Sequence, residues 1–96
     1  LAVVALGKRE ISVDPDLPIP LQLHRRDEPA RSLTGCSIRK VMDQHAMMAI
    51  PEHAGLRVGD IVSFGASHPC LTFDKWRQVL LVDDKLQVLE TMPTWF

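Results

Sequence analysis

The sequence lacks tyrosine, has few aromatic side chains and carries almost no net charge. Among its 96 residues, 11 basic side chains nearly balance 12 acidic ones, which gives a net charge of -1. A small β domain that binds single-stranded nucleic acid combines a basic stripe with interleaved aromatic residues. A near-neutral chain is also not drawn to an anionic membrane surface. We therefore expect no nucleic-acid partner and no membrane partner.

Long hydrophobic runs and a cysteine framework are missing too. No apolar run approaches the roughly 20 residues of a membrane-spanning helix, and no signal-peptide pattern is present. Two cysteines, Cys36 and Cys70, are too few for the disulfide framework of a small secreted domain. A cytoplasmic location is expected. Because the chain opens on Leu1 and an apolar run, we also expect it to be cut from a longer protein.

Helical periodicity is scarce, whereas short apolar or alternating runs recur between prolines, glycines and aspartates. This pattern is typical of an all-β fold, and a chain this short builds one core. We predict a single β domain over residues 1–96, a small β-barrel or sandwich of roughly seven or eight strands. The predicted strands are a buried one at 1–6 that continues at 11–13, then 21–24, 36–42, 46–50, 61–64, 79–82 and 86–89.

The connections between these strands also carry signals. Residues 14–20 contain three prolines, which donate no backbone hydrogen bond, so we predict a stiff connector outside any ladder. Gly59 is able to take a positive φ in a tight turn before the strand at 61–64. Residues 83–85 suit a hairpin turn. Asp43-Gln44-His45 lies at a junction between two strand segments.

The most informative segment for chemistry is Ser67-His68-Pro69-Cys70. In an extended chain, residues two apart face the same side, so His68 and Cys70 would present an imidazole and a thiolate to one metal ion. A mixed nitrogen and sulfur set suits zinc better than magnesium or calcium. Two ligands do not close a tetrahedron, which leaves positions for water or substrate. Taken alone, the same residues also fit a buried cysteine beside a surface histidine.

Several strings together resemble the C-terminal domain of D-serine dehydratase and D-threonine aldolase enzymes. They are Gly7-Lys8-Arg9-Glu10, Leu17-Pro18-Ile19-Pro20, Asp43-Gln44-His45, Arg57-Val58-Gly59-Asp60-Ile61-Val62, Ser67-His68-Pro69-Cys70 and Thr72-Phe73-Asp74-Lys75-Trp76. The resemblance covers most of the chain and is strongest at the His-Pro-Cys element.

The resemblance implies an alanine-racemase-like enzyme, in which an N-terminal barrel holds pyridoxal phosphate (PLP) and a smaller β domain closes the active site. His68 and Cys70 would be the metal ligands, for zinc or another divalent metal such as manganese. Asp43 and His45 would lie near the substrate as catalytic residues. The simpler interpretation is an acid that ends a strand and a histidine that is hydrogen-bonded within the domain. The resemblance gives no role to His24 or His53, which we interpret as solvated side chains.

The implied reaction is β-elimination from a D-hydroxy amino acid, since a cysteine as second ligand favours the dehydratase branch. The resemblance also implies that the full enzyme is a cytoplasmic homodimer. Retro-aldol cleavage of the D-threonine aldolase type, a non-catalytic protein-binding module and a domain with accidental metal-like residues stay open as alternatives. PLP would belong to the full-length enzyme only. None of the four lysines follows an opening barrel strand, where the family's cofactor lysine lies, so this chain alone is expected to be inactive.

Overall fold

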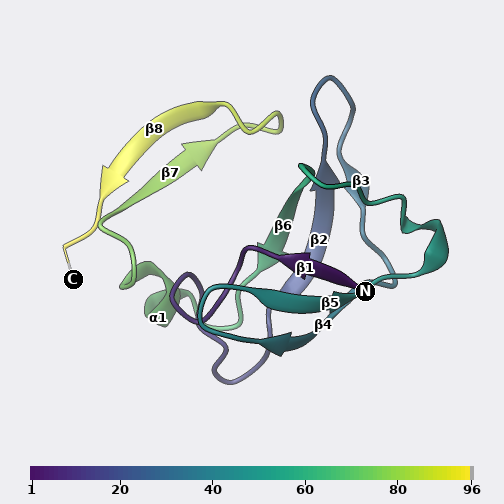
Figure 1. Ribbon diagram of the computed structural model, residues 1–96. Coiled ribbons are helices and arrows are strands. Elements are labelled where there is room, and N and C mark those ends of the chain that lie inside the picture. The colour runs from purple at the N-terminus through teal and green to yellow at the C-terminus, as the bar shows by residue number, and fades with distance from the viewer. Residues whose placement is uncertain (96) are drawn as a thin grey trace.

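The computed structural model describes residues 1–95 as three small antiparallel sheets (Figure 1). Two sheets have three strands, in the orders β1-β5-β4 and β3-β2-β6, and the third is a β7-β8 hairpin. The eight strands are β1 (Ala2–Val4), β2 (Ile19–His24), β3 (Arg31–Ser32), β4 (Ser37–Val41), β5 (Ala46–Ala49), β6 (Ile61–Gly65), β7 (Gln78–Val82) and β8 (Val88–Pro93). A 3-10 turn, η1 (Glu52–Ala54), and one short helix, α1 (Pro69–Phe73), complete the described chain. The prediction of an all-β domain is confirmed.

The core lies on one face of the sheet formed by β1, β5 and β4. Met48 and Ala46 of β5 are fully buried, and they pack with Ile38 and Val41 of β4. Alternation along β5 buries Ala46 and Met48, while the intervening Met47 stays half-buried. Half-buried residues from β1, β6 and the loops close this cluster: Ala2, Val4, Val13, Cys36, Ile50, Leu56 and Phe64.

The second three-stranded sheet is centred on β2. Its strand β6 pairs with β2 from Ile19↔Gly65 to His24↔Ile61, with a register shift after Pro20. Leu23 of β2 is 1% exposed and is one of the largest fully buried side chains. Gly59, with φ +98°, allows the turn that leads into β6, as its sequence context predicted.

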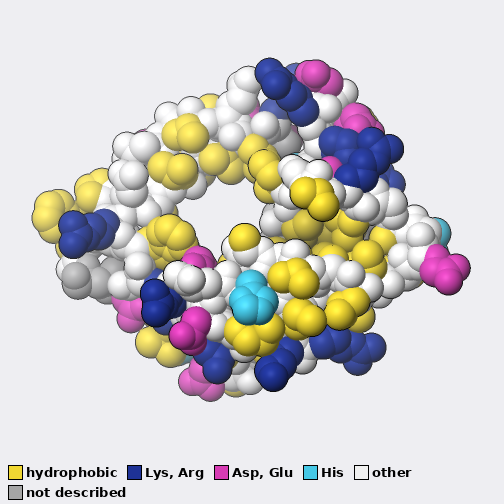
Figure 2. Space-filling view, in the orientation of Figure 1, with side chains coloured by type: hydrophobic (Ala, Val, Ile, Leu, Met, Phe, Trp, Pro, Cys, Tyr) yellow, Lys and Arg dark blue, Asp and Glu magenta, His cyan; other side chains and the backbone are white. Residues whose placement is uncertain are grey.

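The β7-β8 hairpin arches beside the other two sheets, and its tip at residues 83–87 faces the loop that follows β2 (Figure 1). Its strands pair only with each other in the described chain, and Figure 2 shows an open space between it and the rest of the molecule. Apolar side chains on both strands are exposed, including Leu81 (47%) and Leu89 (64%). Exposed apolar surface of this extent is usually covered by another protein or by another domain.

Some strand predictions need correction. Residues 1–6 were predicted to be a buried strand, but β1 is a three-residue edge strand in which Val3 is 65% exposed. Residues 11–13 do not continue it as a strand, although Ile11 and Ser12 are buried. The proline-rich connector was predicted to avoid any ladder, yet β2 begins at Ile19 and includes Pro20. Proline is tolerated there because it lies near the strand start, beside a bulge.

The end of the chain follows the prediction more closely. The hairpin around residues 83–85 is confirmed, but its second strand begins at Val88 and not at residue 86. Asp83 Oδ1 accepts hydrogen bonds from the backbone N–H of Lys85 and of Gln87, so this aspartate stabilises a turn that has no glycine. No helix in residues 1–95 is long and apolar enough to cross a membrane.

An ion pair joins the end of β2 to the turn before β6. Arg25 Nε and Nη2 donate to the two carboxylate oxygens of Asp60 at 2.7 and 2.6 Å, and the Asp60 side chain is 6% exposed. The hydrogen bond from Arg25 is the main cause that lowers the pKa of Asp60 from 3.8 to about 2, and a hydrogen bond from the Arg57 N–H adds to it. The pair therefore ties the two long strands of this sheet together at one end.

The depressed pKa predicts an acid-dependent loss of stability. Above pH 3.8 this carboxylate is ionised in both the folded and the unfolded chain, so its stabilising contribution is fully present; it is lost as the pH falls toward about 2. We expect Asp60→Asn to lower the thermal unfolding midpoint at pH 7, and the difference from the unmodified protein to shrink as the pH falls and to vanish only below about pH 2. Asp84→Asn, at an exposed turn position, is the control that should leave the midpoint unchanged.

Candidate functional site

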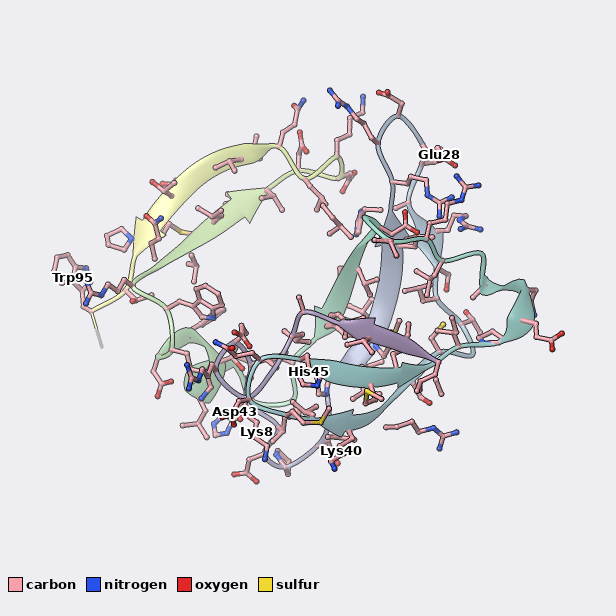
Figure 3. The ribbon with its side chains drawn as sticks, in the orientation of Figure 1. Lys8, Glu28, Lys40, Asp43, His45 and Trp95 are labelled. Carbon is pink, nitrogen blue, oxygen red and sulfur yellow. The ribbon has the colours of Figure 1, made fainter. Side chains whose placement is uncertain are left out.

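Asp43 and His45 lie in the turn between β4 and β5, at the strand junction where the sequence predicted them. The Met42 N–H donates to the His45 carbonyl at 2.8 Å and closes this turn. Both side chains are exposed, and Figure 3 shows Asp43 beside Lys8 at the end of the β4-β5 hairpin. A carboxylate and an imidazole on an exposed turn are free to reach a ligand.

A second segment, residues 7–12, packs its backbone directly on this turn. The Lys8 N–H donates to the Met42 carbonyl at 2.8 Å, and the Arg9 N–H donates to the Asp43 carbonyl at 3.1 Å. Gly7 makes the approach possible, because a Cβ at this position would overlap the Asp43 carbonyl and the Gln44 nitrogen. We call residues 7–12 the 7–12 segment.

The His68–Cys70 element does not lie in an extended chain. His68 is the extended residue that precedes α1, Pro69 is the first helical residue, and Cys70 is the second. The prediction that a strand would orient the two side chains is therefore wrong, since Pro69 is pre-organised to begin a helix and its φ favours that position. The two donors are instead carried by a helix N-terminus, with His68 half-buried and Cys70 exposed.

Side-chain hydroxyls of Ser67 and Thr72 hold the chain on either side of His68. The Thr72 hydroxyl donates to the His68 carbonyl at 3.0 Å and accepts from the Ser12 N–H at 3.0 Å. Ser67, the preceding residue, donates from its hydroxyl to the Asp16 carbonyl at 2.8 Å. The sequence alone indicates no role for Ser67 or Thr72. The only signal for them was their place in the strings that carry the family resemblance.

The ligand types of this element suit a metal ion, but two ligands are too few to complete its coordination. An imidazole nitrogen and a sulfur match the preferences of zinc. No group of three His, Cys, Asp or Glu side chains that could hold a metal ion occurs within residues 1–95. A metal held by His68 and Cys70 would thus keep most of its coordination positions for water, a substrate or groups from outside this chain.

The lysines provide no enclosed position for a carbonyl cofactor. Lys8, Lys40, Lys75 and Lys85 are all exposed, and Figure 3 shows Lys8 and Lys40 at the edge of the molecule. A lysine that forms an imine with PLP is normally desolvated, because burial favours its neutral, nucleophilic form. The residues of this chain do not fit that cofactor.

The two histidines without a predicted role have ordinary surroundings. His24 Nε2 lies 3.1 Å from the Ser63 hydroxyl, across the β2–β6 pair, and is half-buried. It is therefore bonded to its neighbouring strand, whereas the sequence suggested a solvated side chain. His53 is exposed in η1.

A family model described as "Putative serine dehydratase domain" matches residues 1–82. The match includes the 42–45 turn, the 7–12 segment and α1, and it ends at the last residue of β7. A search of curated proteins found no match.

The two thiols are expected to differ in reactivity. Cys70 is exposed, whereas Cys36 is half-buried beside the core and burial raises the pKa of its thiol. Because the thiolate is the nucleophile, we expect iodoacetamide to alkylate Cys70 at least about tenfold faster than Cys36 in the folded protein. Peptide mass spectrometry over a time course measures both rates, and equal rates after unfolding in urea are the control.

Proposed function

Because this chain belongs to the serine dehydratase domain family, we propose that it is the metal-binding β domain of a PLP-dependent D-amino-acid lyase. The proposed reaction is β-elimination from a D-hydroxy amino acid such as D-serine. The observation that carries the proposal is a family match whose span contains both donors, His68 and Cys70, with the thiol exposed.

In this proposal, His68 and Cys70 hold a zinc ion, or another divalent metal such as manganese, at the N-terminus of α1. A zinc ion bound there would supply Lewis-acid assistance to departure of the substrate's β-hydroxyl group. Two protein ligands suit that role, because an ion with open positions is able to accept a substrate oxygen.

Asp43 and His45 act in this proposal on the substrate side of the site. A carboxylate at an exposed turn accepts hydrogen bonds from the ammonium or hydroxyl group of an amino acid, and so orients it. An imidazole on the same turn is able to hold or move a proton at the substrate oxygen. The exposure of both side chains supports an encounter with a ligand that comes from outside this domain.

We place the PLP site on another part of the protein, an N-terminal barrel domain, because the four exposed lysines of this chain do not suit it. The open face near the β7-β8 hairpin supports a partner of this kind, since its exposed apolar side chains would be covered on docking. A homodimer and a cytoplasmic location complete the proposal, and two free cysteines suit a reducing compartment.

Metal content tests the proposed ligands. We expect His68→Ala and Cys70→Ala each to lower zinc affinity by more than about 100-fold, because even residues that only orient a ligand cost about 10- to 100-fold. Competition with a chromophoric chelator measures the affinity in the complete protein. His53→Ala and Cys36→Ala are matched controls of the same residue types and should retain zinc. Unchanged zinc in both ligand variants would dispose of the site.

Activity tests the division between this domain and the rest of the enzyme. The 96-residue chain alone is expected to bind no PLP and to release no pyruvate from D-serine. The complete protein is expected to release pyruvate, and a metal chelator should lower that rate. D-threonine separates the two lyase reactions, since elimination yields 2-oxobutanoate and retro-aldol cleavage yields glycine and acetaldehyde. Glycine as the main product would show the aldolase alternative to be correct.

A further inference from the structure

We infer that the 7–12 segment positions the two halves of the proposed site relative to each other. Gly7, in the segment, and Thr72, in α1, are the key positioning residues. One half is the turn of Asp43 and His45, and the other is the N-terminus of α1 with His68 and Cys70. The inference rests on the proposed function for what the site does. The connection itself is made by backbone and side-chain hydrogen bonds that do not depend on that function.

Contact with the first half is made through backbone alone. The Lys8 and Arg9 N–H groups donate to the carbonyls of Met42 and Asp43. Gly7 lies so close that any side chain would displace the Asp43 carbonyl. A side chain at residue 7 would therefore move the backbone that carries the proposed catalytic carboxylate.

Contact with the second half runs through Thr72. Its hydroxyl accepts from the Ser12 N–H and donates to the His68 carbonyl, so one oxygen links the 7–12 segment to the backbone of the proposed ligand. The Trp76 Nε1–H donates to the Glu10 carbonyl at 2.9 Å and adds a second link just after α1.

The 7–12 segment is itself held in one conformation. The Gly7 N–H donates to Glu10 Oε2 at 2.7 Å, and the Ile11 N–H donates to the Gly7 carbonyl at 3.1 Å. Ile11 and Ser12 are each 6% exposed. A segment closed by its own hydrogen bonds and anchored at a buried end transmits a displacement from one contact to the other.

Helix α1 needs these links because it has little else to hold it. It has five residues and none of them is buried. A helix this short is not stable by itself, so its placement depends on tertiary contacts. With no buried side chain, the polar links from Thr72, Trp76 and Ser67 set where His68 and Cys70 lie.

The test compares variants of the complete protein by zinc affinity and by separate kcat and KM values for D-serine. Thr72→Val removes the shared hydroxyl, and we expect it to lower zinc affinity about tenfold or more, as for other residues that orient a metal ligand. Thr72→Ser keeps the hydroxyl and should restore the affinity. Gly7→Ala should lower kcat with a smaller effect on zinc, because it acts first on the Asp43 turn.

Gly65→Ala is the matched control for Gly7→Ala. A Cβ at Gly65 would lie 3.7 Å from Leu21, an ordinary contact, so zinc affinity and kcat should stay unchanged. If Thr72→Val does not fold, as judged by circular dichroism, Trp76→Phe replaces it. That change removes one N–H from a half-exposed ring and should also lower zinc affinity.

The outcomes separate this inference from the proposed function. If His68→Ala and Cys70→Ala lose zinc while Thr72→Val, or its replacement Trp76→Phe, retains full affinity and kcat, the positioning role is overturned and the metal site stands. Equal loss in Thr72→Val and Thr72→Ser also overturns it, because the hydroxyl would then not be the cause. If all of these variants retain zinc, the proposed metal site fails first.

Discussion

The arrangement of this domain depends on one close approach, where the backbone at Gly7 lies against the backbone of Asp43 and Gln44. Two hydrogen bonds from Lys8 and Arg9 hold the strand junction there, so the turn between β4 and β5 has a fixed neighbour. The same segment then continues to Ser12 and meets α1. A single stretch of chain near the N-terminus thereby connects two elements that are about 25 residues apart in sequence.

The apolar core is small, and this explains why polar backbone contacts carry so much of the organisation. Its buried apolar side chains are Ile11, Leu23, Leu33, Ile38, Val41, Ala46 and Met48. They lie mainly within the two three-stranded sheets, and neither α1 nor the β7-β8 hairpin contributes to them. Small chains bury a modest share of their surface, so elements outside the core need hydrogen bonds or a partner to define their position. Helix α1 has such hydrogen bonds, and the exposed β7-β8 hairpin is suited to a partner.

The sequence predicted correctly the strands in which apolar and polar residues alternate. Its predictions were wrong where contacts with the rest of the fold determine the structure. The β4 and β5 strands, the turn at Gly59 and the final hairpin were correct because period-2 burial and turn residues are local signals. Burial of β1 was wrong, since an apolar run looks the same in a central strand and at an edge. The helix at residues 69–73 was missed because five residues show no helical period.

The candidate site was predictable in its residue types but not in its supports. His68, Cys70, Asp43 and His45 were chosen because their side chains carry chemistry, and the turn position of Asp43 followed from the strand pattern. Gly7 and Thr72 carry no chemistry of their own, so only coordinates reveal what they contact. Both residues lie in strings that carry the family resemblance, as His68 does, and these contacts give that placement a physical basis. A motif marks the residues that hold a backbone in place as well as those that touch a ligand, because displacement of either changes the same site.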